Sequence, residues 1–176
     1  MNSRRQFITK AAAGGVVAAI ASKTAWAGGG RGHATGCSVS GNLSGNLSNN
    51  HDCNSSNIKG LGPSDWKNIL KSRRERESYG VSNSKWKQVF GERSPVGGSK
   101  DGSNRLKSFL NSDGMLTTNE ALIVAYLNVK SGIYPPPNGQ SAEAYVQGLY
   151  DDVNYGVYGV NSEQRLIEAV EATYSN

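Results

Sequence analysis

The sequence predicts an all-α fold, a compact bundle of about six short helices that follows a flexible Gly/Ser/Asn-rich arm. Three observations carry this prediction. Beyond residue 58, large apolar residues recur at helical spacing, helix-starting side chains precede most of these runs, and no pair of segments alternates as two neighbouring strands do. With 176 residues, of which 36% are hydrophobic, the chain is long enough for one modest core.

The first part of the chain, residues 1–27, has the pattern of a twin-arginine signal peptide rather than of a folded element. Arg4 and Arg5, followed by Phe7, form the motif. The apolar stretch behind it, residues 11–20, is only mildly hydrophobic and is shorter than the roughly 20 apolar residues that a permanent membrane span needs. We therefore expect export through the inner membrane without a permanent membrane span.

A cleavage site follows the apolar stretch. Ala25 and Ala27 stand at the two positions where a signal peptidase reads small residues, so cleavage is expected before Gly28. The twin-arginine translocase and signal peptidase are the partners that this leader implies during export. The expected location of the mature chain is the periplasm or the medium outside the cell.

The arm, residues 28–58, holds too few large apolar side chains to offset the entropy of ordering it, so a flexible segment is expected. Both cysteines, Cys37 and Cys53, lie in it. Beyond the inner membrane thiols are oxidised, and a Cys37–Cys53 disulfide is the leading interpretation. The alternative is a tetrahedral Zn or Cu site, because His33 and His51 each stand near one cysteine and supply the other two ligands.

The helical domain is expected over residues 59–176, and its first helix carries an apolar stripe. Trp66, Ile69 and Leu70 recur at i, i+3 and i+4, as residues on one helical face do. Ser64 is the expected N-cap. We expect this helix to continue through the charged run that follows and to end near Gly80.

Two shorter helices are expected next. The first opens at Asn83 or Ser84 and ends at Gly91, a residue that suits a C-terminal cap. A polar loop over residues 92–104 separates it from the second. The residues expected to face inward are Trp86, Val89 and Phe90 on the first helix and Leu106, Phe109 and Leu110 on the second.

The most apolar helix follows a capping box formed by Thr117 and Glu120. Every residue from 121 to 127 is apolar, which predicts the central core helix. Gly132 ends it, and the three prolines at residues 135–137 force an extended connector.

The last two helices are expected to start at Ser141 and Ser162, with Gly156 and Gly159 breaking the chain between them. The residues expected to face inward are Ala144, Tyr145, Leu149 and Val153 on the first and Leu166, Ile167, Val170 and Tyr174 on the second.

Charge divides the helical domain into two halves. Residues 59–107 carry a net charge of +7 and residues 108–176 a net charge of −6. The favoured interpretation is that the halves face and neutralise each other. The alternative is a basic face that meets anionic lipid, a wall polymer or an acidic partner. The residues of that face would be Lys67, Lys71, Arg73, Arg74 and Arg76.

The overall charge excludes one class of partner. Four cations, Arg4, Arg5, Lys10 and Lys23, belong to the leader, and without them the net charge falls from +5 to +1. A strongly basic nucleic-acid binder is therefore not expected.

Catalytic and cofactor motifs are sparse. Residues 59–176 contain no His and no Cys, which removes Ser-His-Asp and Cys-His sites, so no catalytic residue is assigned. One fragment resembles part of an EF-hand, with Asn111, Asp113 and Glu120 at calcium-ligand positions. The alternative is a turn that leads into the capping box, and it accounts for the same residues. No cofactor is predicted unless Zn or Cu occupies the arm.

Several short motifs resemble a module of exported bacterial surface proteins that opens with Ser-Pro-Gly-Tyr-Trp-Lys-Asn-His. The corresponding elements occur in the same order over about residues 60–176, although Ile69 replaces the closing His. They are Gly62 to Asn68, Val89-Phe90-Gly91, Ala125-Tyr126-Leu127-Asn128, Tyr134-Pro135 and a last helix from Glu163 to Tyr174. The resemblance implies a compact exported helical module and carries no known activity.

The sequence therefore predicts an exported, non-catalytic binding or structural module of the cell envelope or extracellular space, with a partner that it does not identify. A small exported metal-binding protein, using the four His and Cys residues of the arm, is the alternative. A carbohydrate-active enzyme is the third hypothesis, and it requires two carboxylates that flank a sugar cleft.

Overall fold

The computed structural model describes residues 60–174, except 99, 112–113, 135–138 and 158. These residues form six α-helices and one 3-10 turn and contain no strand, so the predicted all-α class is confirmed. In chain order the elements are α3 (Pro63–Ile69), α4 (Arg73–Ser78), α5 (Trp86–Phe90), the turn η3 (Leu106–Ser108), α6 (Thr118–Lys130), α7 (Ala142–Asn154) and α8 (Ser162–Glu171).

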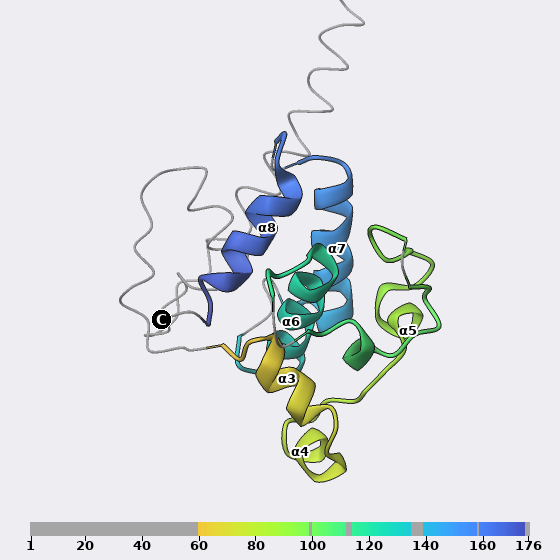
Figure 1. Cartoon of the computed structure of the whole chain (residues 1–176), viewed down its shortest axis with the longest axis vertical. Helices are drawn as coiled ribbons and strands as arrows, with labels where there is room; N and C mark the ends of the chain where they lie inside the picture. The colour runs from red at the N-terminus through yellow and green to blue at the C-terminus, as the bar shows by residue number, and fades with distance from the viewer. Residues whose placement is uncertain (1–59, 99, 112–113, 135–138, 158, 175–176) are drawn as a thin grey trace, which may run out of the picture. The chain divides into compact units, whose positions relative to one another are not determined.

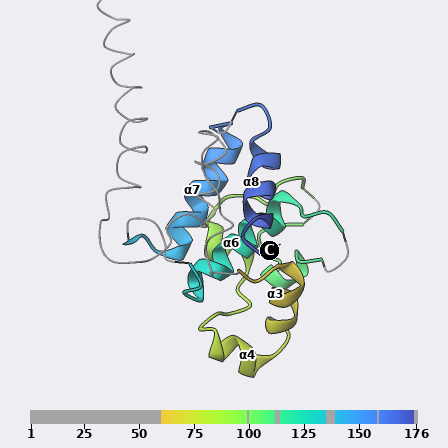
Figure 2. The ribbon, with the colours of Figure 1, turned by 90° about the vertical axis from the view of Figure 1, so that its left-hand side faces the viewer.

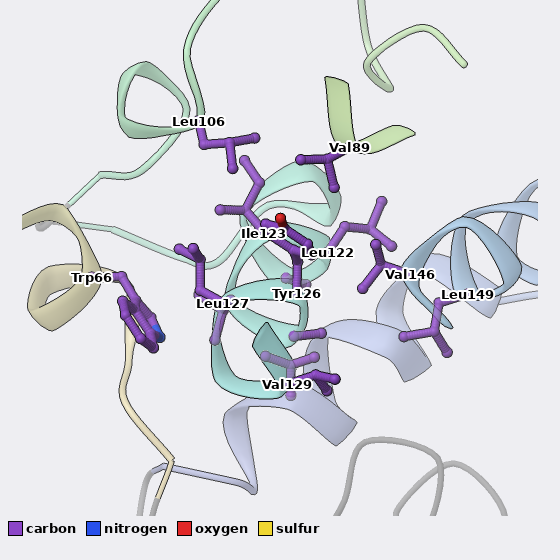
Figure 3. Packing of buried hydrophobic residues seen from close by; sticks show 14 of the residues in the cluster. Trp66, Val89, Leu106, Leu122, Ile123, Tyr126, Leu127, Val129, Val146 and Leu149 are labelled. Carbon is purple, nitrogen blue, oxygen red and sulfur yellow. The ribbon is translucent and has the colours of Figure 1, made fainter. Parts of the chain in front are cut away.

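Helix α6 lies at the centre of the bundle, as its composition predicts (Figure 1). It packs against α7, α8 and α3, while α5 packs against α7 and α4 touches α3 (Figure 2). All residues from 121 to 129 are buried. A helix that is apolar around its whole circumference is stable in water only when neighbours cover every side. Figure 3 shows these neighbours, with Trp66 of α3 on one side and Val146 and Leu149 of α7 on another.

An aromatic cluster packs α5 against α7. The ring of Trp86 stacks on Phe90, with centroids 3.9 Å apart, and packs against Phe109 at 5.2 Å. The indole Nε1 donates a hydrogen bond of 2.6 Å to the carbonyl of Arg93, which satisfies the one polar atom of a fully buried side chain. Tyr150 of α7 completes the cluster with its ring edge-on to Trp86, at 6.5 Å between centroids, and its hydroxyl donates to the Ser94 carbonyl at 2.6 Å.

The first predicted helix is two helices, α3 and α4. Its N-cap is Gly62, not Ser64, and the carboxylate of Asp65 accepts a hydrogen bond of 3.1 Å from the Gly62 amide. The break comes at Ser72, whose hydroxyl accepts from the Glu75 amide and so starts a new helix. A serine offers the backbone a local partner in competition with the helical ladder, which explains the interruption.

The predicted helix after residue 104 is only the three-residue turn η3. Its backbone has partners elsewhere, since the Leu106 amide donates to the Ser84 carbonyl at 2.9 Å and the Lys107 amide donates to the Asn83 side chain at 3.1 Å. The apolar residues expected there, Leu106, Phe109 and Leu110, are nevertheless buried. Two smaller corrections concern α5 and α7: the N-cap of α5 is Lys85 rather than Asn83 or Ser84, and Ala144 of α7 is exposed. Helix α8 starts at Ser162, as predicted.

The beginning of the described chain is held against its end. The Gly60 amide donates to the Thr173 carbonyl at 2.8 Å, and the Tyr134 hydroxyl donates to the same carbonyl at 3.3 Å. A Cβ at Gly60 would lie 1.7 Å from the Tyr134 hydroxyl oxygen, so only glycine fits between these groups. This contact fixes where the chain enters the bundle.

Candidate functional site

Most of the residues predicted to carry chemistry lie outside the described part of the chain. They are Arg4, Arg5 and Phe7 of the signal motif, Ala25, Ala27 and Gly28 at the cleavage site, and His33, Cys37, His51 and Cys53 of the arm. Within the residues that the structure describes, no three His, Cys, Asp or Glu side chains come together as a metal site would require. In the same residues no helix is long and apolar enough to cross a membrane.

The residues of the calcium hypothesis form a helix cap. Glu120 is 2% exposed, and its carboxylate accepts from the Asn111 amide at 2.5 Å and from the amide and hydroxyl of Thr117 at 2.9 and 2.8 Å. Asn111 faces this carboxylate with an N–H donor, whereas a calcium ligand would present an oxygen. Asp113 lies outside the described residues. Both oxygens of Glu120 thus have partners within the protein.

A second carboxylate, Asp151 of α7, is bound by a guanidinium. Arg93 donates from Nε and from one terminal nitrogen to the two oxygens of Asp151, at 2.7 and 2.5 Å. This hydrogen-bonded contact lowers the pKa of Asp151 and raises that of Arg93. A general acid needs a raised pKa, so Asp151 is tuned in the opposite direction.

The Arg93–Asp151 pair makes a prediction about acid stability. A carboxyl whose folded pKa lies below its unfolded value stabilises the fold above the unfolded pKa, and that stabilisation is lost as the pH falls through the folded pKa. Both side chains are about one third exposed. Asp151→Asn should therefore lower the unfolding free energy at pH 7 by only about 0.5–1 kcal/mol. Urea unfolding over an acid pH series should show this difference in unfolding free energy shrinking as the wild-type Asp151 carboxyl is protonated. The control is Glu92→Gln, which changes an exposed carboxylate next to Arg93 and should show no such trend.

In the part of the chain that the structure describes, this ion pair is the one that joins the two charged halves. Among the described residues, the other two ion pairs join Arg73 to Glu77 within the basic half and Lys130 to Glu143 within the acidic half. Arg73 and Arg93 are thus the cations of the basic half that pair with a described carboxylate. The described cations of the basic half without such a partner are Lys67, Lys71, Arg74, Arg76, Lys85, Lys87, Lys100, Arg105 and Lys107.

The basic face predicted from sequence lies on α3 and α4, and we call it the basic end. Helix α4 buries none of its residues, and the helix it packs against is α3 (Figure 1). Lys71 donates to the Asn68 side chain at 3.2 Å, and Arg76 donates to the Leu70 carbonyl at 2.7 Å. Both acceptors are uncharged, so these hydrogen bonds do not neutralise either cation. Three carboxylates, Asp65, Glu75 and Glu77, moderate the charge of this surface.

A second group of surface cations was not predicted from the sequence. Lys85 is the N-cap of α5, and Lys87 lies within this helix. About 20 residues later, Arg105 is the N-cap of η3, and Lys107 lies within this turn. The structure joins the two segments through a bridge between Lys85 and Arg105. We call these four residues the basic ribbon. No spacing rule within a single segment could have revealed it, although all four contribute to the net charge of residues 59–107.

A pocket of about 380 Å³ opens where the loop after α5 meets the starts of α6 and α8. Asn119 shapes its rim by accepting from the Val96 amide at 2.9 Å and donating to the Val96 carbonyl at 2.8 Å. Its two charged residues have partners already: Lys100 donates to the Ser108 carbonyl and lies 5.1 Å from the centroid of the Phe109 ring, and Glu163 accepts from the Thr118 hydroxyl. The pocket therefore presents satisfied groups rather than a reactive pair.

In comparisons with known proteins, no family model, no curated protein and no solved structure matches this chain significantly. The short motifs of the resemblance have structural roles. Trp66, Asn128 and Tyr134 are all buried and hold the entry of the chain against α6 and the end of α8. These motif residues therefore support the fold and leave the surface cations as the candidate functional groups.

Proposed function

We propose that this protein is an exported, non-catalytic module that binds a linear anionic polymer of the cell envelope or extracellular space through its basic half. The observation that carries the proposal is the set of cations without carboxylate partners in that half. Their charge is available to an external anion, because only Arg93 is neutralised by the acidic half among the described residues. The twin-arginine leader supports the exported location.

The composition of the basic end favours a polymer over a lipid surface. A helix that binds a membrane interface inserts an apolar face, usually with Leu, Phe or Trp. Helix α4 has the sequence RRERES and offers no such side chain. Four of the five exposed large apolar side chains in the described part of the chain, Met115, Tyr155, Val157 and Val160, belong to the acidic half.

The same composition disfavours a folded protein partner. Protein interfaces depend on a few buried aromatic or apolar anchors surrounded by polar groups. On the basic half the only exposed large apolar residue that the structure describes is Tyr79, which is 37% exposed and packs edge-on against Trp66. Binding to a polyelectrolyte needs no such anchor, because release of condensed counterions supplies the free energy.

The experiment measures binding of the mature chain to long-chain inorganic polyphosphate over a series of salt concentrations. Lys71 and Arg74 are both exposed, so Lys71→Gln with Arg74→Gln removes two charges without disturbing the core. Affinity should fall about tenfold or more, at about 1 kcal/mol for each cation near an anionic surface. The slope of log affinity against log salt should become shallower by about 1.4, at about 0.7 for each contact.

The matched control removes two cations from the acidic half, Lys130→Gln with Arg165→Gln, which changes the net charge equally. This control should bind like the wild type. Equal weakening by both pairs would show that only net charge matters and would contradict a basic binding face. Tighter binding to anionic lipid vesicles than to polyphosphate would contradict the choice of a polymer.

A further inference from the structure

The basic ribbon is built by backbone pairing between two segments that are distant in sequence. The Trp86 amide donates to the Asn104 carbonyl and the Leu106 amide donates to the Ser84 carbonyl, both at 2.9 Å. Next to them the Lys87 amide donates to the Gly102 carbonyl at 3.0 Å. These bonds fix the backbone positions of the ribbon residues.

The pairing places two like charges directly opposite each other. Hydrogen bonds from the residues flanking Lys85 and Arg105 make these two a non-hydrogen-bonded antiparallel pair, in which the Cβ atoms lie about 4.5–5.5 Å apart on the same face. Like charges in this arrangement destabilise the pairing. Both side chains are exposed, and neither forms an ion pair with a carboxylate of the described residues.

The nearest acid in sequence does not relieve this repulsion. Asp101 precedes the second segment, and its carboxylate accepts from the amide of Ser103 at 2.8 Å and from the side chain of Asn104 at 3.1 Å. Arg105 donates only to the carbonyl of Asn83, at 2.8 Å. The fold thus maintains two opposed cations, and no carboxylate of the described residues forms an ion pair with either of them.

We infer that the basic ribbon is a second contact for the anionic polymer, so that one polymer chain binds the ribbon and the basic end together. The inference rests on the proposed function and adds the residues Lys85, Lys87, Arg105 and Lys107 to its binding surface. An oxyanion group of the polymer lies between Lys85 and Arg105 and removes their repulsion. The free energy that the empty pair costs the fold is therefore regained on binding.

The distance between the two contacts suits a polymer. Lys85 lies seven residues beyond Ser78, the end of α4. A fully extended chain of that length spans at most about 25 Å, at about 3.6 Å for each residue. A flexible polyanion of a few tens of charged units is long enough to reach from one contact to the other. Linking the two contacts in one ligand raises affinity through effective concentration, without any additional contact.

The test replaces Lys85 and Arg105 by Gln in the mature chain and measures long-chain polyphosphate binding at several salt concentrations. The expected result is a loss of at least tenfold in affinity and a salt slope shallower by about 1.4. Combining these changes with Lys71→Gln and Arg74→Gln should give a still shallower slope, because the two pairs contact different parts of the polymer. Inorganic phosphate at the same total phosphate concentration should not displace the polymer, since it cannot link the contacts.

A single substitution separates binding from folding. Lys85→Glu places a carboxylate opposite Arg105, so the melting temperature of the free protein should rise in low salt while polyphosphate affinity falls more than for Lys85→Gln. Opposite changes in stability and affinity cannot come from unfolding. A fall in both would show that Lys85 supports the fold and would overturn the inference.

The two proposals fail in different ways. If the Lys85 and Arg105 pair of changes leaves affinity and salt slope at wild-type values while the Lys71 and Arg74 pair weakens binding, the ribbon is no contact and the proposed function stands. If neither pair changes binding, both proposals are wrong. Displacement by inorganic phosphate alone would replace the polymer by a local phosphate site and overturn the bipartite contact.

Discussion

Replacement of Asn128 by leucine is expected to lower the free energy of unfolding by about 3 kcal/mol or more, because it removes the partner of three backbone and side-chain groups at once. Asn128 is fully buried in α6. Its Oδ1 accepts from the Leu61 amide at 3.0 Å and from the indole Nε1 of Trp66 at 3.3 Å, while its Nδ2 donates to the Leu61 carbonyl at 3.0 Å. Leucine has a similar size, so the loss comes from unsatisfied polar groups rather than from a cavity.

Urea unfolding followed by tryptophan fluorescence measures this loss, and Trp66 itself reports on the network. The control is Asn154→Ala, which removes an exposed asparagine with one hydrogen bond, to the Tyr150 carbonyl at 3.0 Å, and should change stability by no more than about 0.5 kcal/mol. A loss below about 1 kcal/mol for Asn128→Leu would show that water or a rearranged backbone satisfies these groups.

Replacement of Glu120 by glutamine has the second largest expected effect, a loss of about 2–3 kcal/mol. All the partners of the carboxylate are donors, namely the Asn111 amide and the amide and hydroxyl of Thr117. A glutamine amide offers one oxygen and turns its NH₂ group toward a donor, which leaves that donor unsatisfied. Hydrogen bonds to a charged group contribute about 1.5–3 kcal/mol to stability. The negative charge of Glu120 is also stabilised by the positive N-terminal end of the α6 dipole.

The measurement is the midpoint of urea unfolding with and without calcium. Glu163→Gln is the control, since Glu163 is an exposed acid at the start of α8 whose described hydrogen-bond partner is one hydroxyl, that of Thr118. We expect the wild type to have the same midpoint in calcium and in a chelator. A midpoint that falls in the chelator, and no longer does so after Glu120→Gln, would favour the calcium hypothesis over the cap.

The elements that sequence predicted best are those whose signals are local. The capping box of Thr117 and Glu120 forms as predicted, with the Glu120 amide also donating to the Thr117 hydroxyl at 3.3 Å. Gly91 ends α5 with a positive φ of 66°, a conformation that glycine adopts without strain. These predictions hold because capping depends on residues within one turn of each other.

The predictions that were wrong depended on competition for backbone partners. A periodic apolar stripe predicted one helix through Ser72. Instead, the Ser72 hydroxyl accepts a hydrogen bond from the Glu75 amide and starts a new helix. The apolar residues after Arg105 predicted another helix, but the amides at its start bond to the chain at 83–84. Hydrophobic periodicity identified the buried residues in both cases, because burial follows the side chains even when the backbone departs from the helix.

The candidate site shows the same division. Composition alone showed that the two halves of the helical domain carry opposite charge, and sequence placed five cations on the basic end. The favoured interpretation was that the halves face and neutralise each other, but within the described residues the structure joins them by the single ion pair of Arg93 and Asp151. An ion pair depends on the distance between side chains, which a count of charges does not contain.

The sequence by itself determined that the described part of the chain is helical, where the N-caps of α6 and α7 and the C-cap of α5 form, which helix lies at the centre and how the charge is divided. The tertiary structure alone decided that Asn128 holds the entry of the chain, that Glu120 is enclosed by donors, and that Lys85 lies opposite Arg105. The physical reason is range. Capping and periodicity act within a few residues, whereas these contacts join segments whose approach is set by packing of the whole bundle.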